Sequence, residues 1–518
     1  MGYAQNYDVE KNWKKRIKVV KKKKRKEIMK KLLSTVLISV LYVGSVFAET
    51  HSQKTFLAPR AAGVNAAMED VTWHHHIYEK HKGLPETIKS AFQATAFYQR
   101  SVNDEEIGKY FGIGNGRNSF SVAMNQTSGA EVTNADIDGR FFVHKNDNLE
   151  ENKVGLRGKV SFQPYQETCG VKLSFFQSLN SPIENLFFKA MLPVVCVQNN
   201  LNMKISDVET VRVGNKDWSL YDFFAGRVKV TEKDDAADMQ DPLTHAKIDG
   251  RRTAVGPADI DLALGYKWHQ SKTKYGFVGI GMTVPTGTKP RGEYLWEAVY
   301  GNGNHFGLNL SVDGGTQLWK GDYGKVWLTG GLNYKHLFEG TEKRTLGLKG
   351  LDDGPHLAHY ALAGVLEQEN EPFYPLANVL TQDMRVKPGS QLEGMVDFAF
   401  KNKNFIVDCG YSLYWKDAES VWLKEKFSDS MGSITSVTQD SSNPIAEFYY
   451  DVSEENIDID AAKTPMQLTH KLFGGLAYKF DVSDKYPTSL GLGASYEFTQ
   501  DNSALEQYAF WFKVGISF

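Results

Sequence analysis

Apolar and polar residues alternate at every second position in many separate segments of this 518-residue chain. In residues 490–498, leucine, alanine and aromatic residues at the even positions alternate with glycine, serine and glutamate at the odd ones. Because successive side chains of a β-strand point to opposite faces, each such segment predicts a strand with one apolar and one polar face. The pattern is clearest in nine segments: 259–268, 277–284, 306–313, 326–335, 392–400, 405–415, 472–480, 490–498 and 508–518.

The connections between these segments alternate between short and long. The short ones are 269–274, 320–324 and 401–404, and the long ones are 285–304, 339–390 and 417–468. Transmembrane β-barrels have short turns at one end and longer loops at the other. The pattern therefore predicts an all-β fold, specifically a transmembrane antiparallel up-and-down β-barrel.

Several earlier segments alternate less cleanly. They are 135–144, 157–166, 171–180 and 185–197, with 119–126 as a further candidate. Counted together they predict about 14 strands, because single-chain bacterial barrels favour even numbers, and 12 is the alternative. The barrel is then expected to span residues 119–518. Residues 49–118 lack strong alternation, and we expect them to form a periplasmic segment or a plug folded into the lumen.

Residues 29–48 have the features of a secretory signal peptide. A basic start precedes a short apolar run, and cleavage is expected between Ala48 and Glu49. The basic residues before it predict an over-long start, with Met29 as the true initiator, or an extended signal. Residues 1–48 are thus expected to be absent from the mature, exported protein.

Charge and hydropathy exclude two classes of function. The first 31 residues hold 13 Lys and Arg against 3 acids, so loss of the signal changes the formal net charge from −2 to −12. An acidic mature chain argues against a nucleic-acid partner. The mean hydropathy is −0.40, and no other long apolar run is present, which argues against a helical membrane protein.

The last predicted strand carries the most specific motif in the chain. Its even positions are all apolar or aromatic: Tyr508, Phe510, Phe512, Val514, Ile516 and Phe518. With the signal peptide and the alternating strands, this ending resembles the outer-membrane β-barrel proteins of Gram-negative bacteria. The resemblance implies an outer-membrane location, contact with outer-membrane lipid, and recognition of this strand by the barrel-assembly machinery. A barrel with an N-terminal plug is also similar to the long-chain fatty-acid transporter group, although that group's Asn-Pro-Ala motif does not occur in residues 49–118.

The polar faces of the predicted strands place seven acids and four bases toward the lumen. They are Asp259, Asp261, Asp313, Glu393, Asp397, Asp408 and Glu497, with Lys267, Lys335, Lys479 and Lys513. These residues favour a porin-like channel for passive diffusion of small polar solutes, mildly cation-preferring. Alternatively, the charges pair inside a closed barrel that anchors surface loops, which bind a host or cell-wall partner. A transporter of hydrophobic substrates is the third hypothesis.

Two cysteines fall at matching positions of a predicted hairpin. A turn centred on residues 181–184 pairs residues whose numbers sum to 365, such as Phe175 with Ala190. The pairing keeps apolar residues on one face, as a correct register requires. It also places Cys169 opposite Cys196, where an oxidising compartment would permit a disulfide.

Other chemistry has weak signals. Four histidines at 74–76 and 81 lie in the N-terminal segment, and His74 and His76 are weak candidates to share a metal ion. We expect no metal site and no cofactor. A nucleophile motif such as G-x-S-x-G does not occur, so the sequence does not indicate an enzyme.

Overall fold

The computed structural model describes residues 50–518 apart from 69–75, 78–88, 115, 124–134, 144–155, 180–182, 214–215, 231–238, 350–356, 364–372, 428–432, 441–442, 453 and 483–485. The predicted signal peptide, its cleavage site at Ala48 and Glu49, and His74 lie outside the described residues. Thr50–Phe518 form one compact unit. Within the described part of the chain, no helix is long and apolar enough to cross a membrane.

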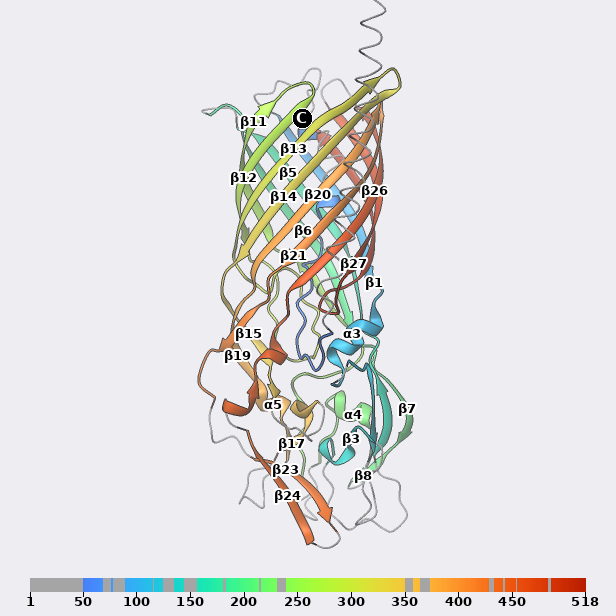
Figure 1. Ribbon diagram of the computed structural model, residues 1–518, viewed down its shortest axis with the longest axis vertical. Coiled ribbons are helices and arrows are strands. Elements are labelled where there is room, and N and C mark those ends of the chain that lie inside the picture. The colour runs from blue at the N-terminus through green and yellow to red at the C-terminus, as the bar shows by residue number, and fades with distance from the viewer. Residues whose placement is uncertain are drawn as a thin grey trace, which may run out of the picture. The chain divides into compact units, whose positions relative to one another are not determined.

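Twelve antiparallel strands form a closed barrel (Figure 1). They are β1 (Ser90–Ser101), β5 (Tyr165–Ser178), β6 (Leu186–Asn200), β11 (Ile260–Gln270), β12 (Lys274–Val284), β13 (Gly307–Gly321), β14 (Gly324–Leu337), β20 (Gly389–Asn402), β21 (Phe405–Lys416), β26 (Gln467–Asp481), β27 (Pro487–Thr499) and β28 (Gln507–Ser517). Strand β1 closes the barrel by pairing with both β28 and β5. A short strand, β10 (Arg252–Pro257), pairs with one half of β6, and β11 pairs with the other half.

The nine clearly alternating segments all form barrel strands, which confirms the all-β class and the transmembrane barrel architecture. The strand count is the predicted alternative of 12, so the count of 14 is wrong. Apart from Tyr165 and Gln166, which begin β5, the described residues of segments 119–126, 135–144 and 157–166 lie outside the barrel wall. Where they are described, their apolar side chains, including Phe120 and Val160, are buried in a core beside the barrel rather than on its outer face.

Strand β1 belongs to the barrel, although the sequence analysis placed its residues in the expected periplasmic or plug segment, 49–118. Its outward face carries Phe92 and Tyr98, each 38% exposed, but Ala94 and Ala96 lie between them. Two alanines weaken the apolar half of the alternation, and this hid the strand in the sequence.

The β5–β6 hairpin has the predicted register. Phe175 pairs with Ala190, and Cys169 pairs with Cys196. Both thiols are present as free cysteines, directly opposite each other. The disulfide therefore stays a prediction.

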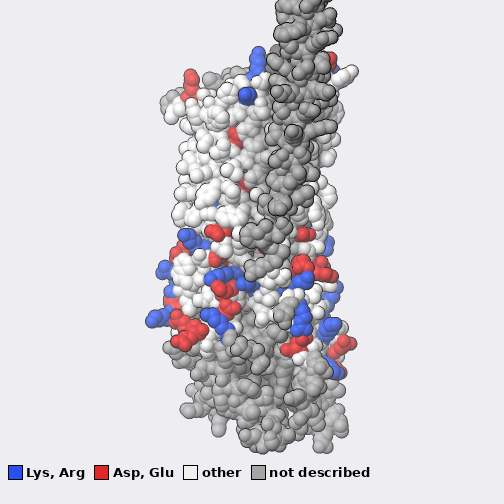
Figure 2. All heavy atoms as spheres, in the orientation of Figure 1, with Lys and Arg blue, Asp and Glu red and all other residues white. Residues whose placement is uncertain are grey.

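The outer surface of the barrel is apolar. Large exposed apolar side chains occupy its strands, including Leu264, Ile280, Leu310, Leu472, Leu492 and Phe510. Figure 2 shows few charged residues along the barrel and many near one of its ends. Exposed apolar surface of this extent indicates contact with lipid rather than water.

The two ends of the barrel differ. The short connections, such as Asp322–Tyr323 between β13 and β14, lie at what we call the turn end. The long connections lie at the opposite end and fold into a second region, visible in the lower half of Figure 1. We call this region the cap, and it comprises the described residues of 102–164, 201–251, 285–306, 338–388, 417–466 and 500–506.

The cap contains short elements around two hydrophobic cores. Its strands are β2 (Ser119–Ala123), β3 (Ile137–Asp138), β4 (Arg157–Ser161), β7 (Lys204–Glu209), β8 (Val211–Val213), β9 (Lys216–Trp218), β15 (Gly340–Thr345), β16 (Gly347–Leu348), β17 (Leu362–Ala363), β18 (Tyr374–Pro375), β19 (Thr381–Lys387), β22 (Ser420–Leu423), β23 (Ser433–Asp440), β24 (Asn443–Asp451) and β25 (Ile457–Asp458). Its helices are α3 (Asp104–Phe111), α4 (Leu220–Phe224) and α5 (Ala377–Leu380). The larger core packs Phe142 against Phe223 and Phe224, and the smaller one includes Met384 and Val386.

Residues 50–68, which we call the N-terminal segment, run from the cap into the barrel. At the cap, the Lys54 N–H donates to the Tyr110 carbonyl over 3.0 Å. Inside the barrel, the Ala66 N–H donates to the Glu393 carboxylate of β20 over 3.2 Å. Further along, His76 contacts Ser517 at the turn end. The described residues 60–66 thus contact the barrel interior, and the periplasmic or plug role of residues 49–118 stays a prediction.

Candidate functional site

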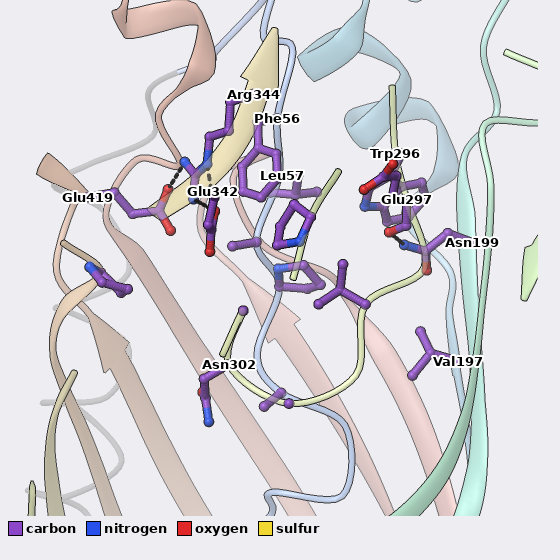
Figure 3. A pocket seen from close by; sticks show the side chains of 18 of the residues that line it. Phe56, Leu57, Val197, Asn199, Trp296, Glu297, Asn302, Glu342, Arg344 and Glu419 are labelled. Carbon is purple, nitrogen blue, oxygen red and sulfur yellow. Dashed lines mark hydrogen bonds and ion pairs between the residues drawn. The ribbon is translucent and has the colours of Figure 1, made fainter. Parts of the chain in front are cut away.

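A pocket opens where the N-terminal segment passes from the cap into the barrel (Figure 3). We call it the cap pocket. Its walls come from residues 55–62, residues 290–305, the ends of β6 and β15, and Lys416 with Glu419. Its cavity volume is about 70 Å³, which is room for several waters.

The connection 285–306 is held over the barrel mouth by Asp259, which lies between β10 and β11. One carboxylate oxygen accepts the Gly287 N–H over 3.0 Å, and the other accepts the Asn302 N–H over 2.7 Å. Gly301 has φ +83°, and a Cβ on it would come within 2.6 Å of the same carboxylate. The loop can approach Asp259 this closely because position 301 lacks a side chain.

A second carboxylate fixes the part of this loop that faces the pocket. Glu297 accepts the backbone N–H of Arg291 over 2.6 Å and of Glu293 over 2.7 Å. Burial raises the pKa of Glu297 despite these hydrogen bonds, which favour its charged form. Asn199 of β6 donates to the Glu297 carbonyl over 2.8 Å. The neighbouring Trp296 packs against Phe111 of α3, with 5.8 Å between the ring centres.

The opposite wall of the pocket is a buried cluster of charges. The guanidinium of Arg344 contacts Glu342 at 2.7 Å and Glu419 at 2.6 Å, and Lys416 contacts Glu419 at 3.4 Å. His305 approaches Glu342 at 2.9 Å. Burial raises the pKa of Glu419, but Arg344 and Lys416 outweigh it and bring that pKa to about 2. Burial lowers the pKa of Arg344, and its two carboxylate partners reverse the shift, so the pKa is raised overall.

This cluster also binds the N-terminal segment. The Arg344 guanidinium carbon lies 3.6 Å from the centre of the Phe56 ring, a cation–π contact. The Lys416 ammonium donates to the Ala58 carbonyl over 3.2 Å, and the Ala58 N–H donates to the Thr464 hydroxyl over 2.9 Å. Figure 3 shows Phe56 beside Arg344 on this wall.

Two residues further along, Arg60 fastens the segment inside the barrel. Its guanidinium forms ion pairs with Glu393 and, at 3.5 Å, with Glu497. It also lies over the Tyr414 ring, 4.5 Å from the centre. Lys471 pairs with Glu497 at 3.0 Å, so this carboxylate has two cationic partners.

A second cavity, which we call the lumen chamber, lies inside the barrel. Its cavity volume is about 150 Å³. Asn65 and Ala66 of the N-terminal segment form one wall, and charged side chains of both signs form others, including Lys172, Lys335 and Asp261. Gln391 lines both the cap pocket and the lumen chamber. The N-terminal segment thus forms a wall of each cavity.

The structure brings most of the predicted lumen residues into the interior, in different roles. Asp259, Glu393, Asp397, Asp408, Glu497 and Lys513 are buried, and Asp261, Lys267, Asp313, Lys335 and Lys479 are partly buried. Asp261 pairs with Lys335 at 3.2 Å, and Lys267 lies over the Phe176 ring at 5.3 Å. Of these eleven, only Asp261, Asp313, Lys335 and Glu393 line the lumen chamber.

Sequence reasoning missed the residues that occupy the lumen and the pocket. Arg60 stands in a segment without alternation and gave no signal. Lys471 could have been found, because it precedes the segment 472–480 and shares the parity of its polar face. Trp296 lies in a long loop, where no periodicity applies.

The weak metal candidate His76 has another role in the structure. Its ring nitrogens contact the hydroxyls of Ser517 at 2.7 Å and Ser489 at 2.8 Å, near the ends of β28 and β27. Among the described residues, no group of three or more His, Cys, Asp or Glu side chains could hold a metal ion.

No family model and no curated protein sequence matches the chain. Solved structures with some likeness include an outer membrane channel from Pseudomonas putida F1, at 8% identity and a TM-score of 0.37, covering 85% of this chain and 98% of that one. The toluene transporter TodX from Pseudomonas putida has 10% identity and a TM-score of 0.31, covering 91% and 98%. The translocator domain of the autotransporter NalP from Neisseria meningitidis has 9% identity and a TM-score of 0.28, covering 84% and 89%.

Likenesses of this size carry no inference about substrate or mechanism. The architecture itself is informative, because a closed antiparallel barrel with an apolar outer surface is one of only two structures that span membranes. The chain is an outer-membrane type of β-barrel whose lumen is occupied by its own N-terminal segment.

Proposed function

We propose that this chain is a gated transport barrel of the outer membrane, which admits a small solute when the N-terminal segment moves. One observation carries the proposal: two cavities, the cap pocket and the lumen chamber, share Gln391 and are both walled by this segment. A solute bound in the cap pocket would reach the chamber if residues 60–66 were displaced. The long loops face outward in barrels of this type, so the cap pocket would be the entry site.

The contacts of the segment are suited to a reversible closure. Arg60 is held by ion pairs rather than by apolar packing alone. After its displacement, Glu497 would keep Lys471 as a partner, and Glu393 would keep the Ser412 hydroxyl, now at 3.3 Å. Neither carboxylate would be left without a polar neighbour, which limits the cost of opening.

The contents of the lumen favour a gated channel over a simple porin. A porin for passive diffusion needs a continuous aqueous path, and residues 59–68 occupy the path in this state. The chamber also presents Lys172 and Lys335 beside its acids, so a simple cation preference does not follow from its charges.

A closed barrel that anchors a binding cap is the second candidate. The cap has two hydrophobic cores and a buried charge cluster, which is more structure than loops of a diffusion channel require. Under this alternative the segment never leaves the lumen, and the cap carries the function.

Single-channel recording in planar bilayers separates the two candidates. We expect infrequent openings of the wild-type barrel and frequent openings of Arg60→Met, because methionine keeps an unbranched apolar stem and loses both ion pairs. Arg385→Met is the matched control, since Arg385 forms an exposed pair with Glu339 at 3.4 Å and should leave conductance unchanged. Folded, heat-modifiable barrels of Arg60→Met that stay silent would contradict the gated channel and favour the anchor.

A further inference from the structure

The cap pocket contains a buried hydrogen-bond donor without an acceptor. Trp296 is 4% exposed, and its Nε1 has no hydrogen-bond partner among the described residues. Figure 3 shows Trp296 on one side of the pocket, across from Phe56 and Leu57. Buried indole N–H groups usually find a partner, so this one needs an explanation.

The chemistry of the donor restricts what could satisfy it. An indole N–H donates one hydrogen bond and accepts none. Its missing partner must therefore be an acceptor, such as a carbonyl, ether or hydroxyl oxygen. The pocket has room for several water-sized molecules, which is enough for a small organic ligand that reaches this wall.

The charged side chains around the pocket argue that the ligand is neutral. Arg344 is occupied by Glu342 and Glu419, and Lys416 by Glu419 and the Ala58 carbonyl. The Glu297 carboxylate is occupied by backbone N–H groups of its own loop. An ionic ligand would have to break one of these contacts or pair with Lys343, an exposed side chain that also lines the pocket, whereas a neutral ligand would do neither.

Apolar side chains form much of the remaining wall, and Asn199, Asn302 and Gln391 add polar groups to it. Phe56 and Leu57 of the N-terminal segment, Val197 of β6, and Leu295 contribute hydrocarbon surface. We infer that the cap pocket binds a small, uncharged, largely apolar molecule with one acceptor oxygen. This oxygen accepts a hydrogen bond from the indole N–H of Trp296. This inference rests on the proposed transport function, because it names the class of solute that would enter.

Calorimetric titration of the purified full barrel tests the inference with a matched set of probes. Acetophenone has an apolar ring and a carbonyl oxygen, α-methylstyrene has the same shape without the oxygen, and benzoate adds a charge. We expect acetophenone to bind roughly fivefold more tightly than α-methylstyrene, the usual gain from one neutral hydrogen bond, and benzoate to bind most weakly.

Two tryptophan variants assign the preference to one donor. Trp296→Phe should abolish the preference for acetophenone while apolar binding persists. Trp218→Phe is the matched control, because Trp218 is also 4% exposed with an unpartnered Nε1 but does not line the pocket. Should Trp296→Phe fail to fold, replacement of Trp296 by benzothienylalanine keeps the ring shape and removes the N–H.

Each result has one meaning. A preference that is lost at position 296 and kept at position 218 supports the inference. Equal binding of acetophenone and α-methylstyrene, a preference for benzoate, or a preference that survives loss of the Trp296 N–H overturns it. Silent Arg60→Met channels would instead contradict the transport proposal while leaving the binding result intact, so the two failures are distinguishable.

Discussion

The barrel wall and the cap follow different rules, although both are built mainly from β-strands. Each barrel strand has an apolar outer face and an inner face that mixes polar and charged residues with apolar ones such as Phe473 and Trp511. Strands of the cap, such as β2, β4 and β19, place apolar side chains in one of two local cores, and their other faces show no regular polarity. The comparison shows that period-two alternation of apolar and polar residues indicates a strand whose two faces meet different surroundings. Strands can form without it, as many do in the cap.

The largest expected effect sharpens this comparison inside the cap. Glu419→Gln leaves Arg344 and Lys416 without their shared carboxylate, and removal of one buried partner costs about 3–5 kcal/mol. We expect the cap to lose protection in hydrogen exchange while the barrel strands keep theirs. Glu339→Gln, at the exposed pair with Arg385, should change stability by less than about 1 kcal/mol. Equal effects of the two variants would contradict a structural role for the cluster.

A charge on an exposed apolar residue should distinguish the two regions directly. Leu492 of β27 is 57% exposed, and Val208 of β7 in the cap is 50% exposed. Leu492→Arg places a charge in lipid and should cost about 2–4 kcal/mol, depending on depth. Val208→Arg places it in water and should change the free energy of unfolding by less than about 0.5 kcal/mol. Urea unfolding of refolded protein in lipid vesicles measures both, and similar values would mean that the apolar surface does not contact lipid.

Acid should weaken the cap mainly through the buried His359. Burial lowers the pKa of His359 to about 3, whereas an unfolded histidine titrates near about 6.5. Between these two pKa values His359 is protonated in the unfolded state but not in the folded state. The free energy of unfolding of the cap is therefore highest above about pH 6.5 and falls as the pH drops. At pH 5 the loss is about 2 kcal/mol. The lowered pKa of Glu419 adds to this loss only below about pH 5, because an unfolded glutamate titrates near 4.5.

Replacement of this histidine isolates its effect. His359→Phe should flatten the dependence of cap stability between pH 7 and 5, measured by hydrogen exchange of residues 357–363. His245→Phe is the control, because His245 also lies in the cap but is only half-buried, and burial lowers its pKa as well. Its replacement should flatten the pH dependence less than replacement of the fully buried His359. An unchanged pH dependence in His359→Phe would exclude this histidine as the cause.

The smallest expected effect concerns a local helix in the cap. Ser219 begins α4, where its hydroxyl and the Asp222 carboxylate form a capping box. Ser219→Ala should cost about 1 kcal/mol of cap stability and leave the barrel unchanged. Ser206→Ala on the exposed strand β7 is the control. A loss that spreads to the barrel strands would show that cap and barrel unfold together.

The sequence predicted the barrel wall well and the interior poorly. Period-two alternation located nine barrel strands, and the parity of the β5–β6 hairpin predicted its register from Phe175 to Cys169. It missed β1, where Ala94 and Ala96 dilute the apolar face. It overcounted strands because 119–126 and 157–166 alternate toward the core of the cap.

The candidate site depended on contacts that no local pattern encodes. The polar parity of the strands predicted Glu393 and Glu497 for the lumen, but not the partner that reaches them. Arg60 lies 333 and 437 positions away from these two carboxylates along the chain. The cap pocket combines Phe56, Trp296 and Arg344 from three separate regions, so only the folded structure brings them together.

A reversible lock tests the central claim most directly. Gly63 lies beside Pro193 of β6, with a Cβ built on Gly63 3.1 Å from the Pro193 Cβ. This is somewhat shorter than the separation of about 3.5–4.5 Å in a disulfide, so a small outward shift of the segment would allow the bond. Gly63→Cys with Pro193→Cys, in a background with the native cysteines changed to serine, should tie the N-terminal segment to the wall. We predict that oxidation abolishes channel openings in planar bilayers and that a reductant restores them. Openings that continue unchanged in the oxidised, cross-linked barrel would contradict closure by this segment.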